Sequence, residues 1–165
     1  MELIEFKDLP NTDTPINAEN LNHNFNYLAE KNYIVATITN EQALSSNYVL
    51  TLDEIVESYG DKLTLSKGKI LIGKGISKIK VSGSIFVNFP TSAGYVWGAI
   101  RKGETKMASN ITTITNGTSY LSTSIPPNIF SVVEGDTIDL LGDSTCGGSA
   151  RTGKANTWLC VEVIE

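Results

Sequence analysis

The sequence has a single histidine, His23, and only two cysteines among 165 residues. One histidine in an asparagine-rich segment cannot supply the groups that catalytic triads or clustered metal sites require. Two cysteines are too few for a disulfide framework, so Cys146 and Cys160 are expected to be free thiols, with a bond between them left open. We therefore expect no enzymatic activity, no cofactor and no bound metal.

Positive charge and long apolar runs are also scarce. The chain carries 13 Lys and Arg against 18 Asp and Glu, a net charge of −5, and its lysines form no basic block. A duplex nucleic-acid partner needs a basic face, and a membrane span needs an apolar run of about 20 residues. The first ten residues are acidic and mixed, unlike a secretory signal peptide. We expect neither nucleic-acid binding nor membrane insertion.

Two stretches approach catalytic motifs without completing them. Residues 148–155 nearly match a phosphate-binding loop, but Ala155 replaces the hydroxyl residue and a strand is expected to follow where a helix must begin. The carboxylates of Asp53, Glu54 and Glu57 give no sign of the opposed acid pair that cleaves glycosides. A flexible loop and a solvated acidic segment are the simpler interpretations.

A short helix is predicted near the N-terminus, ending at about Lys31. Asn17 suits its N-cap, and the apolar stripe has the 3,4,3,4 spacing of a coiled-coil seam: Ala18, Leu21, Phe25, Leu28 and Asn32. Because asparagine is a poor helix former, this helix needs a partner, either the rest of the chain or other copies of itself. The narrow seam favours self-association, which places Leu21, Phe25 and Leu28 in a trimer interface.

From Tyr33 onward the hydrophobic period changes from helical to two, which is typical of strands. The expected strands span residues 33–39, 62–72, 76–89, 95–102, 105–115, 119–125, 136–142 and 157–164. Residues 52–59 are expected to form a helical turn or an irregular loop. Asn116-Gly117 predicts a hairpin, and Pro126-Pro127 is expected to break the strand before it. Eight short strands predict a β-sandwich or jelly roll.

The last predicted strand is apolar on both faces. Leu159, Val161 and Val163 fit a core, which leaves the other side of the strand without cover. That side carries Trp158, Cys160 and Ile164. A neighbouring subunit around a three-fold axis would cover it, so these three residues are predicted to lie in the trimer interface.

Residues 14–22, TPINAENLN, resemble an N-terminal element of tail and baseplate proteins in phages of Gram-positive bacteria. Residues 135–141 and 158–164 resemble the last two strands of the jelly roll in complement heads and tumour-necrosis-factor-like proteins. The resemblance implies a mainly β homotrimer: residues 1–32 dock to other tail or baseplate proteins and trimerise, and residues 33–165 form a jelly-roll head. It also implies a receptor-binding protein of the virion, made in the host cytoplasm, that binds a host cell-wall saccharide. The alternative is a structural baseplate or fibre-tip module without receptor binding.

The saccharide site is expected at the tip of the head. Alternating strands that start beside the stalk place the connections 41–61, 90–94, 116–118 and 143–156 at the far end. Candidate ligand-binding residues there are Tyr95, Asp143, Arg151 and Asn156, which offer a stacking ring and hydrogen-bonding groups. Trp97 has two open interpretations, a packed strand residue or a sugar-stacking surface.

Overall fold

The computed structural model describes residues 32–44, 46–88, 90–115, 120–153 and 155–165, in which every regular element is a strand. The predicted mainly β jelly-roll architecture is confirmed. The predicted helix, with Leu21, Phe25 and Leu28, lies outside the described residues and stays a prediction. Asn32, the last member of its predicted stripe, is buried in the sandwich, where its backbone oxygen accepts a hydrogen bond from the Val163 N–H at 2.8 Å.

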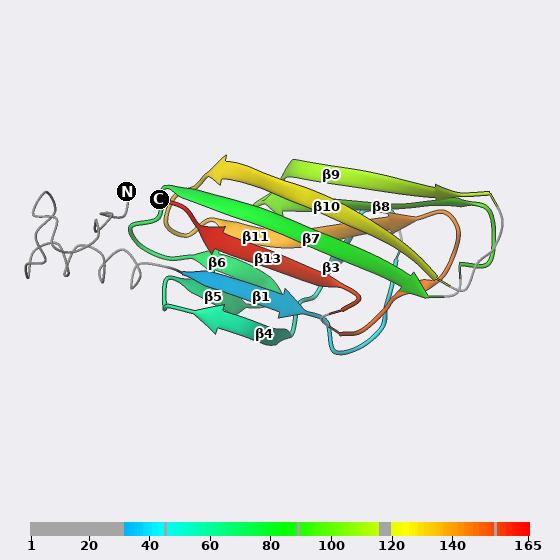
Figure 1. Cartoon of the computed structure of the whole chain (residues 1–165), viewed down its shortest axis with the longest axis horizontal. Helices are drawn as coiled ribbons and strands as arrows, with labels where there is room; N and C mark the ends of the chain where they lie inside the picture. Colours follow the sequence, from blue (N-terminus) through cyan, green and yellow to red (C-terminus); the bar gives the residue numbers. More distant parts are fainter. Residues whose placement is uncertain (1–31, 45, 89, 116–119, 154) are drawn as a thin grey trace, which may run out of the picture. The chain divides into compact units, whose positions relative to one another are not determined.

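The strands form two antiparallel sheets packed face to face, and Figure 1 shows β7, β13 and β1 of one sheet in front of β11 of the other. Sheet A has the order β2-β12-β7-β13-β1-β4, with β10 also paired to β7. Its strands are β1 (Tyr33–Thr37), β2 (Gln42–Ala43), β4 (Glu54–Tyr59), β7 (Lys78–Asn88), β10 (Tyr120–Ser131), β12 (Ser149–Ala150) and β13 (Trp158–Val163).

Sheet B has the order β5-β6-β11-β8-β9, with β3 also paired to β11. Its strands are β3 (Tyr48–Leu50), β5 (Leu63–Ser66), β6 (Lys69–Ile72), β8 (Gly94–Lys102), β9 (Thr105–Ile114) and β11 (Thr137–Ser144). Each sheet therefore has one face toward the core and one outer face, and the two outer faces lie on opposite sides of the sandwich.

The core follows from the alternation of side chains along the long strands. In β7 the predicted inward set is buried, as Ile79, Val81, Ile85 and Val87 show, while Lys78 on the alternate face is exposed. Each such aliphatic side chain contributes about 2 kcal/mol when it is fully buried. Sheet B supplies the facing layer, whose fully buried members include Ile70, Ile100, Ile138 and Leu140. This shared layer fixes which side chains remain for the outer faces.

Residues 62–72 were predicted as one strand, and that prediction is wrong. They form the β5–β6 hairpin, in which Ser66 pairs with Lys69. Lys67 and Gly68 between them have φ values of 50° and 79°. Positive φ at both central positions is the geometry of the tight turn that joins antiparallel strands. The sequence does carry a signal for the turn, because the run of polar and glycine residues 66–69 separates Leu63 and Leu65 from Ile70 and Ile72, whose inward positions have the opposite parity.

Residues 52–59 are neither a helical turn nor an irregular loop, because they include strand β4, which pairs with β1 at the edge of sheet A. The pattern was hidden because nearly all of β4 is exposed, with only Val56 half-buried.

Pro126 and Pro127 do not end their strand either. β10 continues to Ser131, and its pairing register with β7 shifts between Ile125 and Asn128. Among the described strands β10 pairs with β7 alone, and an edge strand tolerates proline at such a bulge.

The predicted hairpin around residues 116–117 is corrected as well. Strand β9 pairs with β8 in sheet B, whereas β10 pairs with β7 in sheet A, so the chain crosses from one sheet to the other. The turn residues themselves lie outside the described residues. Asn110 still links the two strands, since its side-chain amide donates to the Ser124 carbonyl at 2.7 Å.

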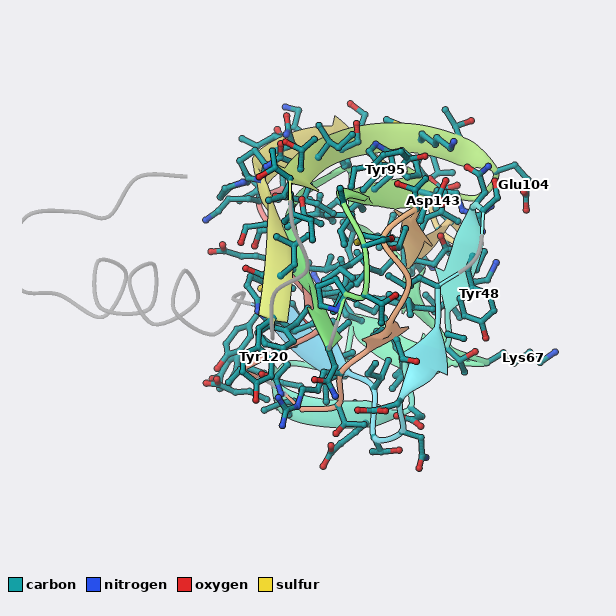
Figure 2. All side chains as sticks on the ribbon, turned by 90° about the vertical axis from the view of Figure 1, so that its right-hand side faces the viewer. Tyr48, Lys67, Tyr95, Glu104, Tyr120 and Asp143 are labelled. Atoms are coloured by element: carbon teal, nitrogen blue, oxygen red, sulfur yellow. The ribbon has the colours of Figure 1, made fainter. Side chains whose placement is uncertain are left out.

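Two of the predicted tip connections meet at the end of the sandwich that lies away from the C-terminus (Figure 1). The Thr91 N–H donates to the Cys146 carbonyl at 2.8 Å, which joins the β7–β8 and β11–β12 connections. Figure 2 looks onto this end and places Tyr95 and Asp143 close together. Residues 41–61, predicted as a tip connection, instead contain β2, β3 and β4.

Candidate functional site

The outer face of sheet A carries an apolar row at its centre. Cys160 of β13 lies between Val35 of β1 and Ser82 of β7 in the pairing register, and Trp158 lies next to Ser84. Val35, Ser82, Trp158 and Cys160 line a shallow hollow of about 270 Å³. All four are half-buried. We call this set the sheet A patch.

Further apolar side chains continue the sheet A patch in both directions. Ile129 of β10 pairs with the outward-facing Lys80 and is 61% exposed, and Ile164 after β13 is 48% exposed. Charged residues at its border are paired: Lys80 lies 2.7 Å from the Glu162 carboxylate, and the Tyr33 hydroxyl donates to Glu57 at 2.7 Å. The face therefore presents apolar surface framed by polar groups that already have partners.

The Cys160 thiol lies within the sheet A patch and differs from a free surface thiol. Burial raises its pKa above the ordinary value, and the nearby Glu162 carboxylate raises it further. Lys80 opposes this shift. Because the thiolate is the reactive form, Cys160 suits a packing role better than a nucleophilic one. Cys146 is buried, and both cysteines are free thiols.

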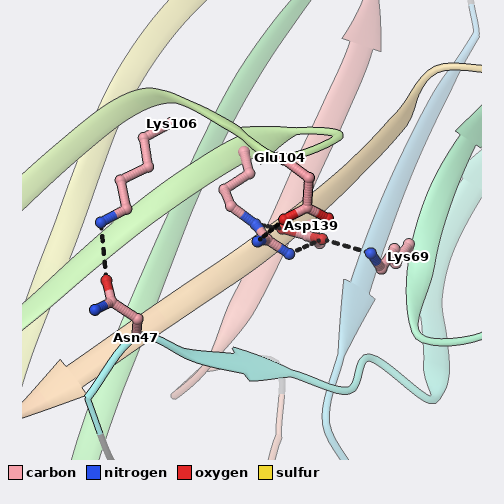
Figure 3. A network of polar contacts seen from close by, with 6 residues as sticks. Asn47, Lys69, Glu104, Lys106 and Asp139 are labelled. Carbon is pink, nitrogen blue, oxygen red and sulfur yellow. Dashed lines mark hydrogen bonds and ion pairs between the residues drawn. The ribbon is translucent and has the colours of Figure 1, made fainter.

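The outer face of sheet B is built differently, around a buried carboxylate (Figure 3). Asp139 of β11 is 0% exposed, and it accepts two hydrogen bonds from the Arg101 guanidinium, both at 2.8 Å. Lys69 lies 3.1 Å from the same carboxylate, and Glu104 lies 3.1 Å from Arg101. The pKa of Arg101 is raised mainly by its hydrogen bond to Asp139. Each charged group of this network is therefore paired with an opposite charge within the network.

A second hollow, of about 260 Å³, lies on the outer face of sheet B near the tip. Trp97 of β8 pairs with Asp143 of β11 on one side and with Ile111 of β9 on the other. We call this set the sheet B hollow; its lining residues are Asn47, Tyr95, Trp97, Lys106, Ile111 and Asp143.

One rim of the sheet B hollow is formed by a lysine that lies over the tryptophan ring. The Lys106 ammonium lies 4.5 Å from the ring centroid of Trp97, within the range of a cation–π contact. It also donates a hydrogen bond to the Asn47 side-chain oxygen at 2.8 Å (Figure 3). Asn47 has a φ of 54°, a conformation that asparagine tolerates better than most residues. The contact joins β9 to the segment before β3 across the sheet.

The four predicted ligand-binding residues do not form one cluster. Tyr95 and Asp143 both line the sheet B hollow, but Arg151 and Asn156 do not. The Arg151 guanidinium lies 5.1 Å from the ring centroid of Tyr120 and 5.9 Å from that of Phe86. Figure 2 shows Tyr120 well away from Tyr95 and Asp143. The Asn156 amide donates to the Thr152 carbonyl within its own loop.

Sequence reasoning left Trp97 open and missed Asn47, Lys106 and Ile111. The spacing of Tyr95 and Trp97 already placed both on the same face of one strand. Nothing in the sequence, however, gives the register that brings Asn47 and Lys106 together across 59 positions of the chain. Strand pairing had to be known before the hollow could be assembled.

The predicted interface residues of the last strand are on the outer face, as expected from their alternation with Leu159 and Val161. Trp158 and Cys160 line the sheet A patch, and Ile164 extends it. No second cover for them occurs within the described residues. Whether another subunit supplies it stays a prediction.

Other chemistry is sparse in the part of the chain that the structure describes. There, no group of three or more His, Cys, Asp or Glu residues could hold a metal ion. Asp53 accepts hydrogen bonds from the backbone and hydroxyl of Thr39, at 2.7 and 2.6 Å, so it fastens a turn. No helix among the described residues is long and apolar enough to cross a membrane.

The fold is that of a tumour-necrosis-factor-like jelly roll. Crystal structures of murine APRIL at pH 5.0 and at pH 8.5 superpose on the chain with TM-scores of 0.63 and 0.58. Their sequence identities are 10% and 12%, and each comparison covers 82% of this chain and 100% of the other. At these identities the likeness concerns the fold. The sequence itself matches no family model and no curated protein.

Proposed function

We propose that this chain is the receptor-binding protein of a phage tail or baseplate, a homotrimer whose jelly-roll head adheres to a host cell-surface saccharide. In this proposal residues 1–32 trimerise and dock to other virion proteins, and the protein has no enzymatic activity. The observation that carries the homotrimer in this proposal is the sheet A patch, since it lies at the centre of a sheet face with half-buried apolar side chains and paired charges around it.

The sheet A patch supports self-association on physical grounds. Further burial of Trp158 and Cys160 in an interface would lower the free energy of the assembled protein. The border pairs Lys80–Glu162 and Tyr33–Glu57 already have hydrogen-bond partners and need no new one. A face with an apolar centre and a polar rim has the composition of a protein–protein interface. The resemblance to complement-head and tumour-necrosis-factor jelly rolls implies the three-fold arrangement.

The virion role is supported by residues 14–22, whose resemblance is to tail and baseplate proteins. A trimer carries three copies of any weak site, and many trimers on one particle multiply weak contacts further. The rival function, a structural fibre-tip module, shares the trimer and the docking segment. It differs in having no affinity for the cell surface.

Two measurements on the full chain test the proposal. Sedimentation equilibrium is expected to give three times the 17.8 kDa mass of one chain. Fluorescently labelled protein is expected to bind purified cell walls from a panel of Gram-positive bacteria, with Gram-negative cells as the control. A monomeric mass would overturn the trimer. A trimer that binds no cell wall in the panel would favour the structural module.

A further inference from the structure

We propose that the sheet B hollow binds one neutral pyranose unit of a cell-surface polysaccharide. This inference rests on the proposed adhesion function and names the site that performs it. The hollow has three features that a sugar site needs: an aromatic surface, polar groups with hydrogen-bonding capacity to spare and an open position on the head.

The aromatic surface comes from one strand. Tyr95 and Trp97 are two positions apart on β8, so their side chains leave the sheet on the same face, and both are half-buried. The C–H groups on one face of a pyranose ring are apolar and pack against an aromatic ring, while the hydroxyls at its edge remain free for polar contacts. Ile111, 52% exposed, adds apolar surface beside Trp97.

The polar groups suit a ligand rich in hydroxyl groups. The Asp143 side chain is half-buried opposite Trp97 and makes no hydrogen bond or ion pair with the described residues. An ionised carboxylate only accepts hydrogen bonds, so its natural partner here is a pair of neighbouring hydroxyls on the ligand. The charges of Asp143 and Lys106, the two ionised residues that line the hollow, balance each other, and the inference is therefore a neutral ring.

Lys106 supplies hydrogen-bond donors to the same hollow. Its ammonium uses one N–H to bind Asn47 and has two more. These can donate to the ring or hydroxyl oxygens of a sugar that packs against Tyr95 and the uncovered part of Trp97. A donor group and an acceptor group in one hollow suit a ligand whose hydroxyls offer both.

The position of the hollow agrees with the proposed trimer. It lies on sheet B, on the side of the sandwich opposite the sheet A patch, so assembly through sheet A leaves three hollows open. The neighbouring Arg101–Asp139 network links β8 to β11 by two charge-assisted hydrogen bonds, which restrain this part of sheet B. A preformed, rigid site loses less entropy when it binds.

The two tryptophans of the chain allow the site to be read directly. In a Trp158→Phe protein, Trp97 is the only tryptophan, and in a Trp97→Phe protein only Trp158 remains. Each protein is titrated with the methyl glycosides of glucose, galactose, rhamnose and N-acetylglucosamine, with glycerol as a control for bulk polyol. We expect a saturable change in emission with at least one glycoside for Trp158→Phe and none for Trp97→Phe.

Asp143→Asn tests the acceptor, with Asp61→Asn as its matched control, since Asp61 is exposed and lies outside the hollow. In the Trp158→Phe background, Asp143→Asn is expected to weaken glycoside binding by about tenfold, equivalent to about 1.4 kcal/mol, and Asp61→Asn to leave it unchanged. Circular dichroism melting and sedimentation confirm that each variant keeps its fold and mass.

Several outcomes would overturn the inference. No saturable response in Trp158→Phe while the full chain still adheres to cell walls would remove the hollow as the site and leave adhesion standing. Equal losses of glycoside affinity in Asp143→Asn and Asp61→Asn would also remove the hollow as the site. Tighter binding of glucose 6-phosphate than of methyl glucoside would overturn the inference of a neutral ring. If the full chain adheres to no cell wall, the adhesion function fails, and the titration still decides whether the hollow binds a sugar.

Discussion

The outer faces of the two sheets are built from strands of the same alternating kind, yet they differ in where they place apolar and charged side chains. Sheet A leaves Trp158, Cys160 and Val35 half-covered at its centre and pairs the charges around them. Sheet B buries the Asp139 carboxylate under its own partners, Arg101 and Lys69. One face has polar groups at its rim and the other has them at its centre.

The difference is the basis of the roles that we propose for the two faces. Burying a charge is unfavourable unless the charge is paired, and in sheet B the partners of the buried carboxylate come from the same chain. A continuous apolar surface is instead stabilised by a second surface that removes it from water. This contrast is the reason for proposing that sheet A is the assembly face and that sheet B stays in solvent and receives a small polar ligand.

The largest expected effect comes from removing the buried carboxylate of sheet B. Asp139→Ala leaves the Arg101 guanidinium largely buried without its two hydrogen bonds. We expect the free energy of unfolding to fall by about 3 kcal/mol, measured by urea denaturation. The matched control is Glu104→Ala, which removes an Arg101 partner whose side chain is 88% exposed and should cost less than about 1 kcal/mol. Equal losses in the two variants would show that the network is not effectively buried.

The next effect concerns assembly through sheet A. Trp158→Ala removes the largest side chain of the sheet A patch and is expected to weaken the trimer by about 2 kcal/mol per protomer. Sedimentation should then show monomers at concentrations where the unchanged protein is trimeric. Leu71→Ala is the control, because Leu71 is a partly exposed apolar residue of sheet B. If the Trp158→Ala protein stays trimeric and the Leu71→Ala protein dissociates, the interface lies on sheet B instead.

The fold could be predicted because alternation is a local property of the sequence. The inward residues of β7 and β13 were readable one strand at a time, and the outward Trp158 and Cys160 followed by parity. The two errors have different causes. The turn at Lys67-Gly68 interrupts the alternation with four polar or glycine residues, 66–69, and this signal was overlooked. β4 is exposed on nearly all of its length, so it gave no contrast between faces.

The site could be predicted only in part because it depends on register. Tyr95 and Asp143 were chosen as tip residues, and they do share the sheet B hollow. Arg151 was chosen on the same grounds, but it stacks on Tyr120 instead. Strand parity gives the end of the sandwich on which a residue lies and does not give the sheet. The contact of Lys106 with Asn47 requires three-dimensional pairing that no local pattern contains.

The smallest expected effect is on the reactivity of Cys160, which tests whether the sheet A patch is shielded from solvent. Burial and the Glu162 carboxylate raise the pKa of this thiol, so less thiolate is present at pH 8 than for an ordinary cysteine. Alkylation by iodoacetamide, followed by peptide mass spectrometry, is expected to be slower at Cys160 than in the urea-unfolded chain. Glu162→Gln removes the second cause of the shift, so it should lower the pKa and moderately speed the reaction at fixed pH. Trp158→Ala should speed it more, because it opens the sheet A patch as well as weakening the trimer. If native Cys160 reacts as fast as in the unfolded chain, the sheet A patch is open to solvent, and the contrast between the two faces fails on the side where assembly is proposed.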